Sequence, residues 1–408
     1  MRSMYEDTYA LLRPCPLCES RLGLNLGTLC FKNFDQSPIS GSVSLVVCSL
    51  CGFAFYDTSN TQADFDRYYQ QNAYYCTAVT TGSGGASRHD TMRFDSLFQR
   101  IAAHIPSSDA AIFDVGCARG GLLSILAQRG FSHLYGVDMV PECVSFIRDT
   151  LGMLAETGSA LDLPFPDVQA DVLVYSHVVE HVINLSSLVA TAYRKLSDRG
   201  ILYVEVPDAS RYGEYTNNPY QDLYLEHVNH FDMSTLSALF GAGGFEAVST
   251  GRYELEASSV GKVPCVWAIF RKGAVISLEK SELALETHLR EYLSWSGHHP
   301  ALTRFRELEQ SKTPIYLWGI SQYAMLLMGQ TPLRNCDIRG FVDKDASKRM
   351  RTLIGKSIDS PDVLSSAERG CGVLVTAPGY EGAIAAALRS MGFNGDVLTA
   401  SGEVMILK

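Results

Sequence analysis

A glycine-rich turn between an apolar strand and a helix constrains this chain more than any other feature. Residues 113–121 read Phe-Asp-Val-Gly-Cys-Ala-Arg-Gly-Gly, and Asp138 follows Gly116 by 22 residues at the end of a second apolar strand. Small residues let the backbone approach a bound ligand closely, and a carboxylate at the second strand tip can hold the two hydroxyls of a ribose. The layout predicts a doubly wound α/β fold that binds a nucleotide-like ligand at this turn.

The carboxylate of Asp114 distinguishes the two ligand classes that share this layout, dinucleotides and S-adenosylmethionine (SAM). It lies two residues before Gly116. Negative charge there repels a pyrophosphate but attracts the ammonium and sulfonium groups of SAM. We therefore expect SAM as the cofactor. The residues expected to hold it are Asp114, Gly116, Cys117, Ala118, Gly120, Asp138, Met139, Ala160, Leu161 and His177.

These residues are expected to contact different parts of the ligand. The glycine turn itself is expected to surround the methionine end of SAM. Asp138 is expected to bind the ribose hydroxyls, and Met139 to lie against the adenine face. Ala160 and Leu161 precede the strand predicted at 171–175 and offer backbone groups to adenine. His177 follows that strand directly, and ligands of such folds sit at the carboxyl edge of the sheet.

Two cysteine knuckles near the N-terminus predict a structural zinc site. They are Cys15-Pro-Leu-Cys18 and Cys48-Ser-Leu-Cys51, separated by 29 residues. Two thiolate pairs of this spacing complete a tetrahedral Zn²⁺ site and leave no open position for a catalytic water. A ribbon of this length buries little core of its own, so the metal is expected to contribute folding energy directly.

Length and composition bound the remaining possibilities. The chain has 408 residues, 46% of them hydrophobic, and a net charge of −10, which predicts two or three globular domains and no nucleic-acid partner. No apolar run approaches the ~20 residues of a membrane span, and the N-terminus lacks a secretory h-region. The 11 cysteines fit a reducing compartment, so a cytoplasmic location is expected. The oligomeric state is not predicted.

The pattern along the chain predicts two Rossmann-like units behind the zinc ribbon. Strands are predicted at 111–115, 134–137, 171–175, 201–206, 246–253 and 263–271, the last two as an antiparallel pair. A second strand and glycine turn begins at Pro314, but the turn at Gly319 keeps one glycine of the dinucleotide pattern, which disfavours an NAD site. The predicted domains are 1–75 (zinc-binding), 76–275 (SAM-binding), 276–310 (helical linker) and 311–408 (C-terminal Rossmann-like).

A cluster of proton-capable side chains follows the strand predicted at 201–206, in a stretch expected to be irregular. It reads Tyr224-Leu-Glu226-His227-Val-Asn-His230-Phe231. Imidazole titrates near neutral pH, so His227 is the favoured general base, while His230 is expected to be structural. The alternatives are a hydrogen-bonded surface loop and a second metal site.

Taken in order, these motifs resemble the sugar C-methyltransferases of deoxysugar biosynthesis over nearly the whole chain. The shared features are the zinc knuckles, a tyrosine-rich segment, the glycine turn, Val-Val-Glu-His, Tyr-x-Glu-His-x-x-x-Phe and a degenerate C-terminal Rossmann unit. The resemblance implies SAM-dependent methylation of a nucleotide-linked 4-ketosugar bound between the middle and C-terminal domains. It implies His227 as the base, supported by Tyr224 and Glu226, and an active-site tyrosine at Tyr74 or Tyr75.

Several functions remain open at this stage. The same base can serve carbon methylation through an enolate or oxygen methylation of a glycan or secondary-metabolite hydroxyl. A non-catalytic assembly protein with a SAM fold and a nicotinamide oxidoreductase are the alternatives from other classes. Two segments depart from the family pattern near the expected acceptor site, His230 and the stretch 262–267. In each enzymatic case the partner is a small-molecule acceptor.

Overall fold

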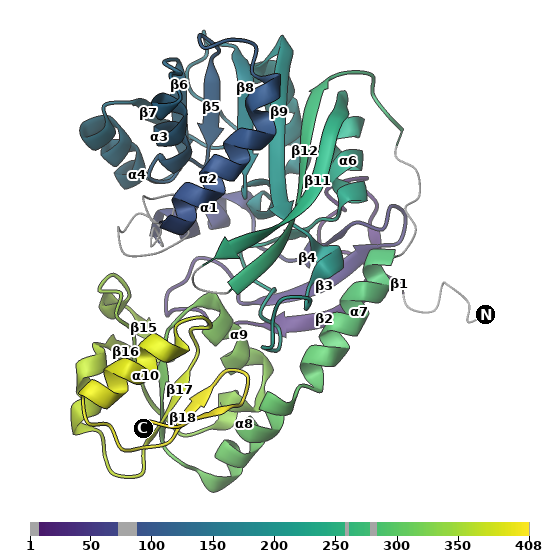
Figure 1. Cartoon of the computed structure of the whole chain (residues 1–408). Coiled ribbons are helices and arrows are strands. Elements are labelled where there is room, and N and C mark those ends of the chain that lie inside the picture. Colours follow the sequence, from purple (N-terminus) through teal and green to yellow (C-terminus); the bar gives the residue numbers. More distant parts are fainter. Residues whose placement is uncertain (1–7, 72–87, 258–260, 278–283, 408) are drawn as a thin grey trace.

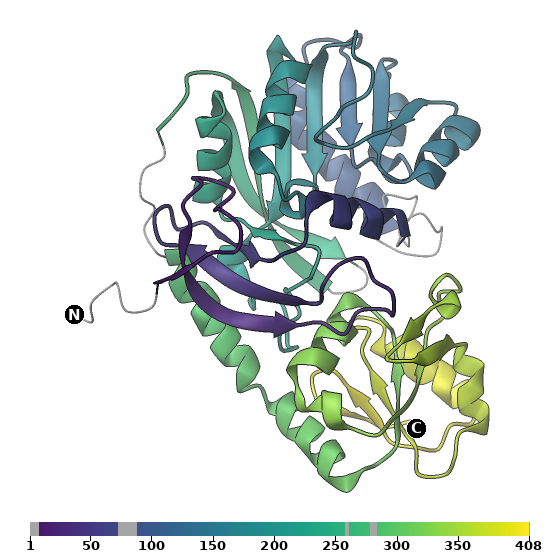
Figure 2. The same cartoon turned by 180° about the vertical axis from the view of Figure 1, so that it is seen from behind.

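The computed structural model describes residues 8–71, 88–257, 261–277 and 284–407, which form three β-sheets. Figures 1 and 2 show the N-terminal sheet, in purple, between the central sheet and the C-terminal unit. Helix α7 (Ala284–Gly297) runs beside the N-terminal sheet, and α8 (Pro300–Ser311), which follows it, lies against the C-terminal unit. Within the described ranges, no helix combines the length and the apolar character that crossing a bilayer requires.

The central sheet has the strand order β11-β12-β9-β8-β5-β6-β7. Every neighbouring pair is parallel except those made by β12, which is antiparallel to both of its neighbours, as predicted for the closing pair. The strands are β5 (Ile112–Val115), β6 (Leu134–Asp138), β7 (Leu154–Thr157), β8 (Ala170–Ser176), β9 (Leu196–Pro207), β11 (Phe245–Ala257) and β12 (Gly261–Lys272). The predicted α/β doubly wound class is confirmed.

Helices cover both faces of this sheet, and each face has its own buried core. One core contains Leu97, Leu122 and Val144, and the other contains Leu188 and Leu236. The helices are α2 (Arg88–Ile101), α3 (Gly121–Gln128) and α4 (Pro141–Phe146) on the first face, and α5 (Leu185–Lys195) and α6 (Met233–Ala242) on the second. The strand order reverses at β5, because the chain continues to β6 on one side of it and later returns to β8 on the other, which opens a crevice at the carboxyl ends of these strands.

The N-terminal sheet is antiparallel and takes its last strand from far along the chain. Its strands are β1 (Thr8–Ala10), β2 (Leu22–Cys30), β3 (Ser42–Cys48), β4 (Ala54–Asp57) and β10 (Asn229–His230), and α1 (Gln62–Gln71) follows β4. Asn229 pairs with Phe55, and His230 with Ala54. The prediction that the Tyr224–Phe231 segment is irregular throughout was therefore wrong at residues 229–230, because an existing sheet edge supplies hydrogen bonds that no local pattern announces.

The C-terminal unit is a second Rossmann-like sheet with the order β15-β16-β14-β13-β17-β18-β19. Its five inner strands are parallel and its two edge strands are antiparallel. The elements are β13 (Ile315–Trp318), α9 (Gln322–Gln330), β14 (Ile338–Val342), β15 (Thr352–Leu353), β16 (Lys356–Asp359), β17 (Gly372–Val375), α10 (Glu381–Ser390), β18 (Val397–Thr399) and β19 (Val404–Met405). The bounds of the four domains stay a prediction.

The N-terminal sheet shares its core with the C-terminal unit. Leu29 and Val43 belong to the same buried cluster as Leu317 and Met325. At Gly329 the two backbones approach so closely that a Cβ would lie 1.8 Å from the Cys30 carbonyl oxygen, so only glycine fits there. The apolar face of the ribbon therefore packs on α9, and the core that it buries is shared with the C-terminal unit.

Candidate active site

A cavity of about 300 Å³ opens at the carboxyl ends of β5, β6 and β8. Every residue predicted to hold the cofactor, except Gly120, lines it. These lining residues are Asp114, Gly116, Cys117, Ala118, Asp138, Met139, Ala160, Leu161 and His177. One space is thus surrounded by the glycine turn and the carboxyl ends of β6 and β8, as the doubly wound topology requires.

The two glycines of the turn have different tasks. Gly116 has φ 75° and lines the cavity, and a Cβ there would lie 2.7 Å from Cγ2 of Val178. Gly120 has φ 74° and lies directly before α3, where a Cβ would meet Ile147 at 3.0 Å. Gly120 is not among the residues that line the cavity, and its contact with the cofactor stays a prediction. Gly120 permits the left-handed entry into the helix and its close packing on Ile147.

Two buried acids give the cavity a negative side. Both oxygens of Asp138 accept backbone hydrogen bonds, from Ala118 N–H at 2.8 Å and from Val140 N–H at 2.9 Å. Burial nevertheless raises the pKa of Asp138 to about 6. Burial, with a contribution from the nearby Asp138, also raises the pKa of Asp114 to about 7, although Arg93 opposes the rise. A bound cationic group would compensate these charges.

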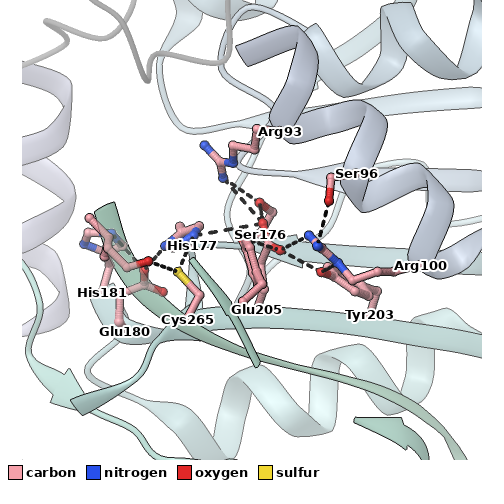
Figure 3. Close-up of polar contacts among 12 residues, drawn as sticks. Arg93, Ser96, Arg100, Ser176, His177, Glu180, His181, Tyr203, Glu205 and Cys265 are labelled. Carbon is pink, nitrogen blue, oxygen red and sulfur yellow. Dashed lines mark hydrogen bonds and ion pairs between the residues drawn. The ribbon is translucent and has the colours of Figure 1, made fainter. Parts of the chain in front are cut away.

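Arg93 on α2 also lines the cavity, and sequence reasoning missed it. Its guanidinium donates to the Ser176 hydroxyl at 2.6 Å and lies 3.7 Å from Oε1 of Glu205 (Figure 3). Oε2 of Glu205 also accepts from the guanidinium of Arg100, at 2.9 Å. Although burial acts against the charge, His177 and the two arginines lower the pKa of Glu205 to about 2. Arg93 belongs to no motif that has a fixed spacing from the glycine turn. The sequence around it shows only the pattern of an amphipathic helix.

His177 gives the cavity wall a second positive group. Its φ is 55°, a left-handed conformation that turns the ring between Glu180 and Cys265 (Figure 3). Nδ1 lies 3.1 Å from Oε1 of Glu180, and Nε2 lies 3.9 Å from Sγ of Cys265. Burial opposes a charge on the ring, but Cys265 and Glu180 together raise the pKa of His177 to about 10. The cavity therefore offers both carboxylates and cations, which suits a zwitterionic amino-acid moiety.

A second set of polar groups lines the cavity and comes from three different segments. Tyr69 on α1, His181 after β8 and Glu226 all line it. Nδ1 of His181 lies 2.8 Å from the Tyr69 hydroxyl and 3.1 Å from the backbone carbonyl oxygen of Glu226. The Glu226 carboxylate accepts a hydrogen bond from the side-chain amide of Gln322 on α9. The C-terminal unit therefore contacts the site directly.

The structure places His227 and Tyr224 behind this set, outside the residues that line the cavity. The His227 ring centre is 4.9 Å from the ring centre of His181 and equally far from that of Tyr224. Burial, with His181, His230 and His177 nearby, lowers the pKa of His227 well below its usual value, so the ring is neutral. Tyr75 and Tyr74, the other predicted tyrosines, lie outside the described residues.

Short polar contacts hold this cluster on the N-terminal sheet. Asn229 in β10 donates from its side chain to the carbonyl oxygens of Val179, at 3.2 Å, and Val182, at 2.7 Å, which flank His181. His230 is fully buried beside Tyr56, and burial lowers its pKa to about 3, in keeping with a structural role. The pairing of β10 with β4 therefore sets where the His181 and His227 rings meet.

The four cysteines of the two knuckles converge. Sγ of Cys15 lies 3.6 Å from that of Cys51, and Sγ of Cys18 lies 3.5 Å from that of Cys48. Four sulfurs at Zn–S distances of about 2.3 Å would be about 3.8 Å apart in a tetrahedron. All four sulfurs lie within 4.8 Å of one another, so the set fits a tetrahedral metal ion.

Comparison with known proteins places this site in a recognised domain. Residues 87–250 match the family described as "Methyltransferase domain". A "probable S-adenosylmethionine-dependent methyltransferase" of Mycolicibacterium smegmatis is 25% identical over 182 residues, 42% of this chain and 67% of that protein. A protein of Mycobacterium tuberculosis with the same description is 24% identical over 165 residues, 40% of this chain and 57% of that protein.

Solved structures are similar to part of the chain. A SAM-dependent methyltransferase from Methanosarcina mazei has 19% identity, covers 43% of this chain and 97% of that chain, and has a TM-score of 0.37. The [4+2]-cyclase SpnF has 14% identity, covers 53% of this chain and 97% of that chain, and has a TM-score of 0.41. The family match and the site geometry together show that the middle of this chain is a methyltransferase domain, and that the protein is an enzyme, an S-adenosylmethionine-dependent methyltransferase.

Proposed function

We propose that the enzyme methylates a carbon of a nucleotide-linked ketosugar, with His227 as the general base. The observation that carries this proposal is the pair His181 and Glu226 on the wall of the cavity that Asp114 and Asp138 also line, with the His227 ring packed against His181 directly behind that wall. A methyltransferase needs a base only at the acceptor, because the sulfonium is already a strong electrophile. An acid/base cluster at this position therefore serves acceptor deprotonation.

The residues proposed to hold SAM divide by charge. Asp114 would face the ammonium, Asp138 would accept from the ribose hydroxyls, and Arg93 and His177 would face the methionine carboxylate. When bound, SAM supplies an electrophilic methyl group. The chain itself contributes alignment of the acceptor, since holding two reactants in line replaces a bimolecular encounter.

The proposed proton transfer follows from the state of the His227 ring. Its lowered pKa keeps the imidazole neutral, so a nitrogen lone pair is available to take the proton α to the ketone. The C–H electron pair passes into the enolate, and polar groups at the cavity, Tyr69 and His181, are close enough to one another to stabilise the enolate oxygen together. Loss of the proton from His227 to solvent restores the base.

The C-terminal unit and the cysteine cluster are given supporting roles in this proposal. Gln322 brings the C-terminal unit into contact with Glu226, so the nucleotide part of the acceptor would extend toward that unit. The cysteine cluster would hold a structural Zn²⁺ that stabilises the sheet on which β10 is carried.

Solvent-exchange measurements test the proposal. His227→Gln and the wild-type enzyme are incubated in D₂O with the demethylated cofactor and a dTDP-4-ketosugar, and deuterium at the α carbon is followed. We expect exchange in the wild type and at least a hundredfold slower exchange in the variant, with unchanged cofactor affinity as the control for folding. Equal exchange rates would remove His227 from the role.

Product analysis separates carbon from oxygen methylation. A methyl group on carbon together with α-proton exchange supports the proposal. A methyl ether without exchange would support an O-methyltransferase that uses the same base on a hydroxyl. Binding of SAM without transfer to any sugar nucleotide would show that the acceptor belongs to another class of small molecule.

A further inference from the structure

We propose that Glu180, His181 and His227 form a binding site for one divalent transition-metal ion, separate from the four-cysteine cluster. Each residue offers one ligand atom, and the three atoms lie within 4.8 Å of one another. Two imidazole nitrogens and one carboxylate oxygen are a common ligand set for Zn²⁺, Co²⁺ and Ni²⁺. Mg²⁺ and Ca²⁺ prefer all-oxygen sites and are not expected here.

The His181 ring is already oriented as a metal ligand. Its Nδ1 faces two oxygens, the Glu226 carbonyl at 3.1 Å and the Tyr69 hydroxyl at 2.8 Å. A proton on Nδ1 satisfies both and leaves a lone pair on Nε2, which points toward Oε1 of Glu180 at 3.9 Å. Ligating histidines in proteins are held in this way by a carbonyl or hydroxyl on the other ring nitrogen.

Two atoms of the cluster are buried without a hydrogen-bond partner in the described part of the chain. They are Oε2 of Glu180 and Nδ1 of His227, and Glu180 is only 1% exposed. Unpartnered buried polar atoms are uncommon, and two on neighbouring members of one three-residue set point to a shared ligand. A cation between the three residues would satisfy both atoms.

The surrounding contacts hold the set in place before any ion binds. Oε1 of Glu180 lies 3.1 Å from Nδ1 of His177, which leaves the other carboxylate oxygen for the ion. Figure 3 shows the two side chains in contact. Asn229 holds the carbonyls of Val179 and Val182 on either side of the Glu180–His181 pair. Such second contacts fix carboxylate and imidazole ligands in known metal sites.

An ion at this site would be accessible from the cavity. His181 lines the cavity, and three protein ligands leave at least one coordination position for water or an acceptor oxygen. The consequence for catalysis rests on the proposed function. An ion that takes a lone pair of His227 withdraws the base, so metal binding and removal of the α-proton exclude each other.

Cobalt titration tests the site without reference to catalysis. Full-length protein with its cysteine cluster loaded with Zn²⁺ is titrated with Co²⁺, and the visible d–d absorption is followed. We expect one equivalent to bind without the near-ultraviolet absorption of cobalt thiolate. His227→Gln and Glu180→Gln are expected to bind at least tenfold more weakly, and the control His133→Gln, an exposed histidine far from the cavity, to bind as the wild type does.

The possible results are decisive. Absence of the d–d absorption, or equal cobalt affinity in the wild type and His227→Gln with cofactor affinity intact in both, would overturn the site. Failure of His227 as a base would leave the cobalt titration unchanged, so the two proposals are tested separately. If stoichiometric Co²⁺ leaves α-proton exchange at its original rate, the inhibitory consequence is wrong.

Discussion

Gln322, the first residue of α9, donates a hydrogen bond from its side-chain amide to the carboxylate of Glu226, which lies 96 positions earlier in the chain. The same amide group donates to the Tyr68 hydroxyl at 2.9 Å, and its oxygen accepts from the Leu225 N–H at 2.8 Å. One side chain of the C-terminal unit therefore joins α1 and the Tyr-x-Glu-His segment at the edge of the cavity.

Replacing Gln322 with methionine should impair turnover and spare cofactor binding. The substitution keeps the length of the side chain but leaves the Leu225 N–H without its acceptor and removes one hydrogen bond to Glu226, which costs about 1–3 kcal/mol. We expect kcat to fall by about tenfold or more, with the SAM dissociation constant within about twofold of wild type. Steady-state kinetics and calorimetry measure the two quantities.

The matched control lies at the other end of the same helix. The Gln330 side chain accepts a hydrogen bond from the Cys30 N–H at 3.1 Å and so ties α9 to β2, far from the cavity. Gln330→Met should lower the melting temperature by a few degrees and leave kcat unchanged. If both variants lose turnover equally, Gln322 acts through overall stability and not through the position of Glu226.

Cofactor affinity should rise with pH between about 5.5 and 7.5. The pKa values of Asp138 and Asp114 are raised to about 6 and about 7, so both carboxyls are largely protonated at the low end and cannot balance the cationic ligand. Calorimetric titration with the demethylated cofactor should show affinity that increases by about tenfold or more over this range. Asp114→Asn should flatten the profile, and a flat wild-type profile would contradict the assignment of Asp114.

The same two acids affect the stability of the ligand-free protein with the opposite sign. Their pKa values lie above the ordinary 3.8, so the folded chain binds more protons than the unfolded chain between about pH 4 and pH 7. Their contribution to the free energy of unfolding therefore falls as pH rises through that window. Asp114→Asn should reduce this loss in urea unfolding measured at about pH 5 and pH 7.5, and an unchanged difference would show that Asp114 is not the group responsible.

Asp138→Asn tests the ribose assignment. The carboxylate is fixed by the N–H groups of Ala118 and Val140, and an amide must turn its NH₂ group toward one of those donors or toward the ribose. We expect SAM affinity to fall by about 10- to 100-fold, since a charge-assisted hydrogen bond is worth about 1.5–3 kcal/mol. The control Asp167→Asn, at an exposed position, should bind SAM normally, and equal losses in both would point to a general charge effect.

Removal of one knuckle thiolate should affect both the fold and turnover. Cys48→Ser should lose the tightly bound zinc and about 5 °C or more of melting temperature. Turnover should fall as well, because β3 leads through the knuckle into β4, and β4 pairs with β10 beside His227. Cys30→Ser, outside the cluster, should keep its zinc, as measured by elemental analysis. Full turnover without zinc would contradict this coupling.

The elements that the sequence predicted are those that depend on residues close together in the chain. The alternation of apolar strands with helices predicted the central sheet, and the strand at 111–115 is observed as Ile112–Val115. The small residues around Gly116 and the acids at 114 and 138 predicted which strand tips form the ligand space, because parallel topology brings those tips together. The cysteine spacing likewise predicted the convergence of four thiols.

Tertiary contacts decided what faces the cavity. Arg93, Glu226 and His181 line it, whereas His227 lies behind His181. The different positions of the neighbours Glu226 and His227 depend on the pairing of β10 with β4. Gln322 reaches the site only because α9 packs on the N-terminal sheet. Periodicity and spacing act within a few turns or strands of the chain, whereas strand register and the packing of distant surfaces are settled by the whole buried core, which no local window contains.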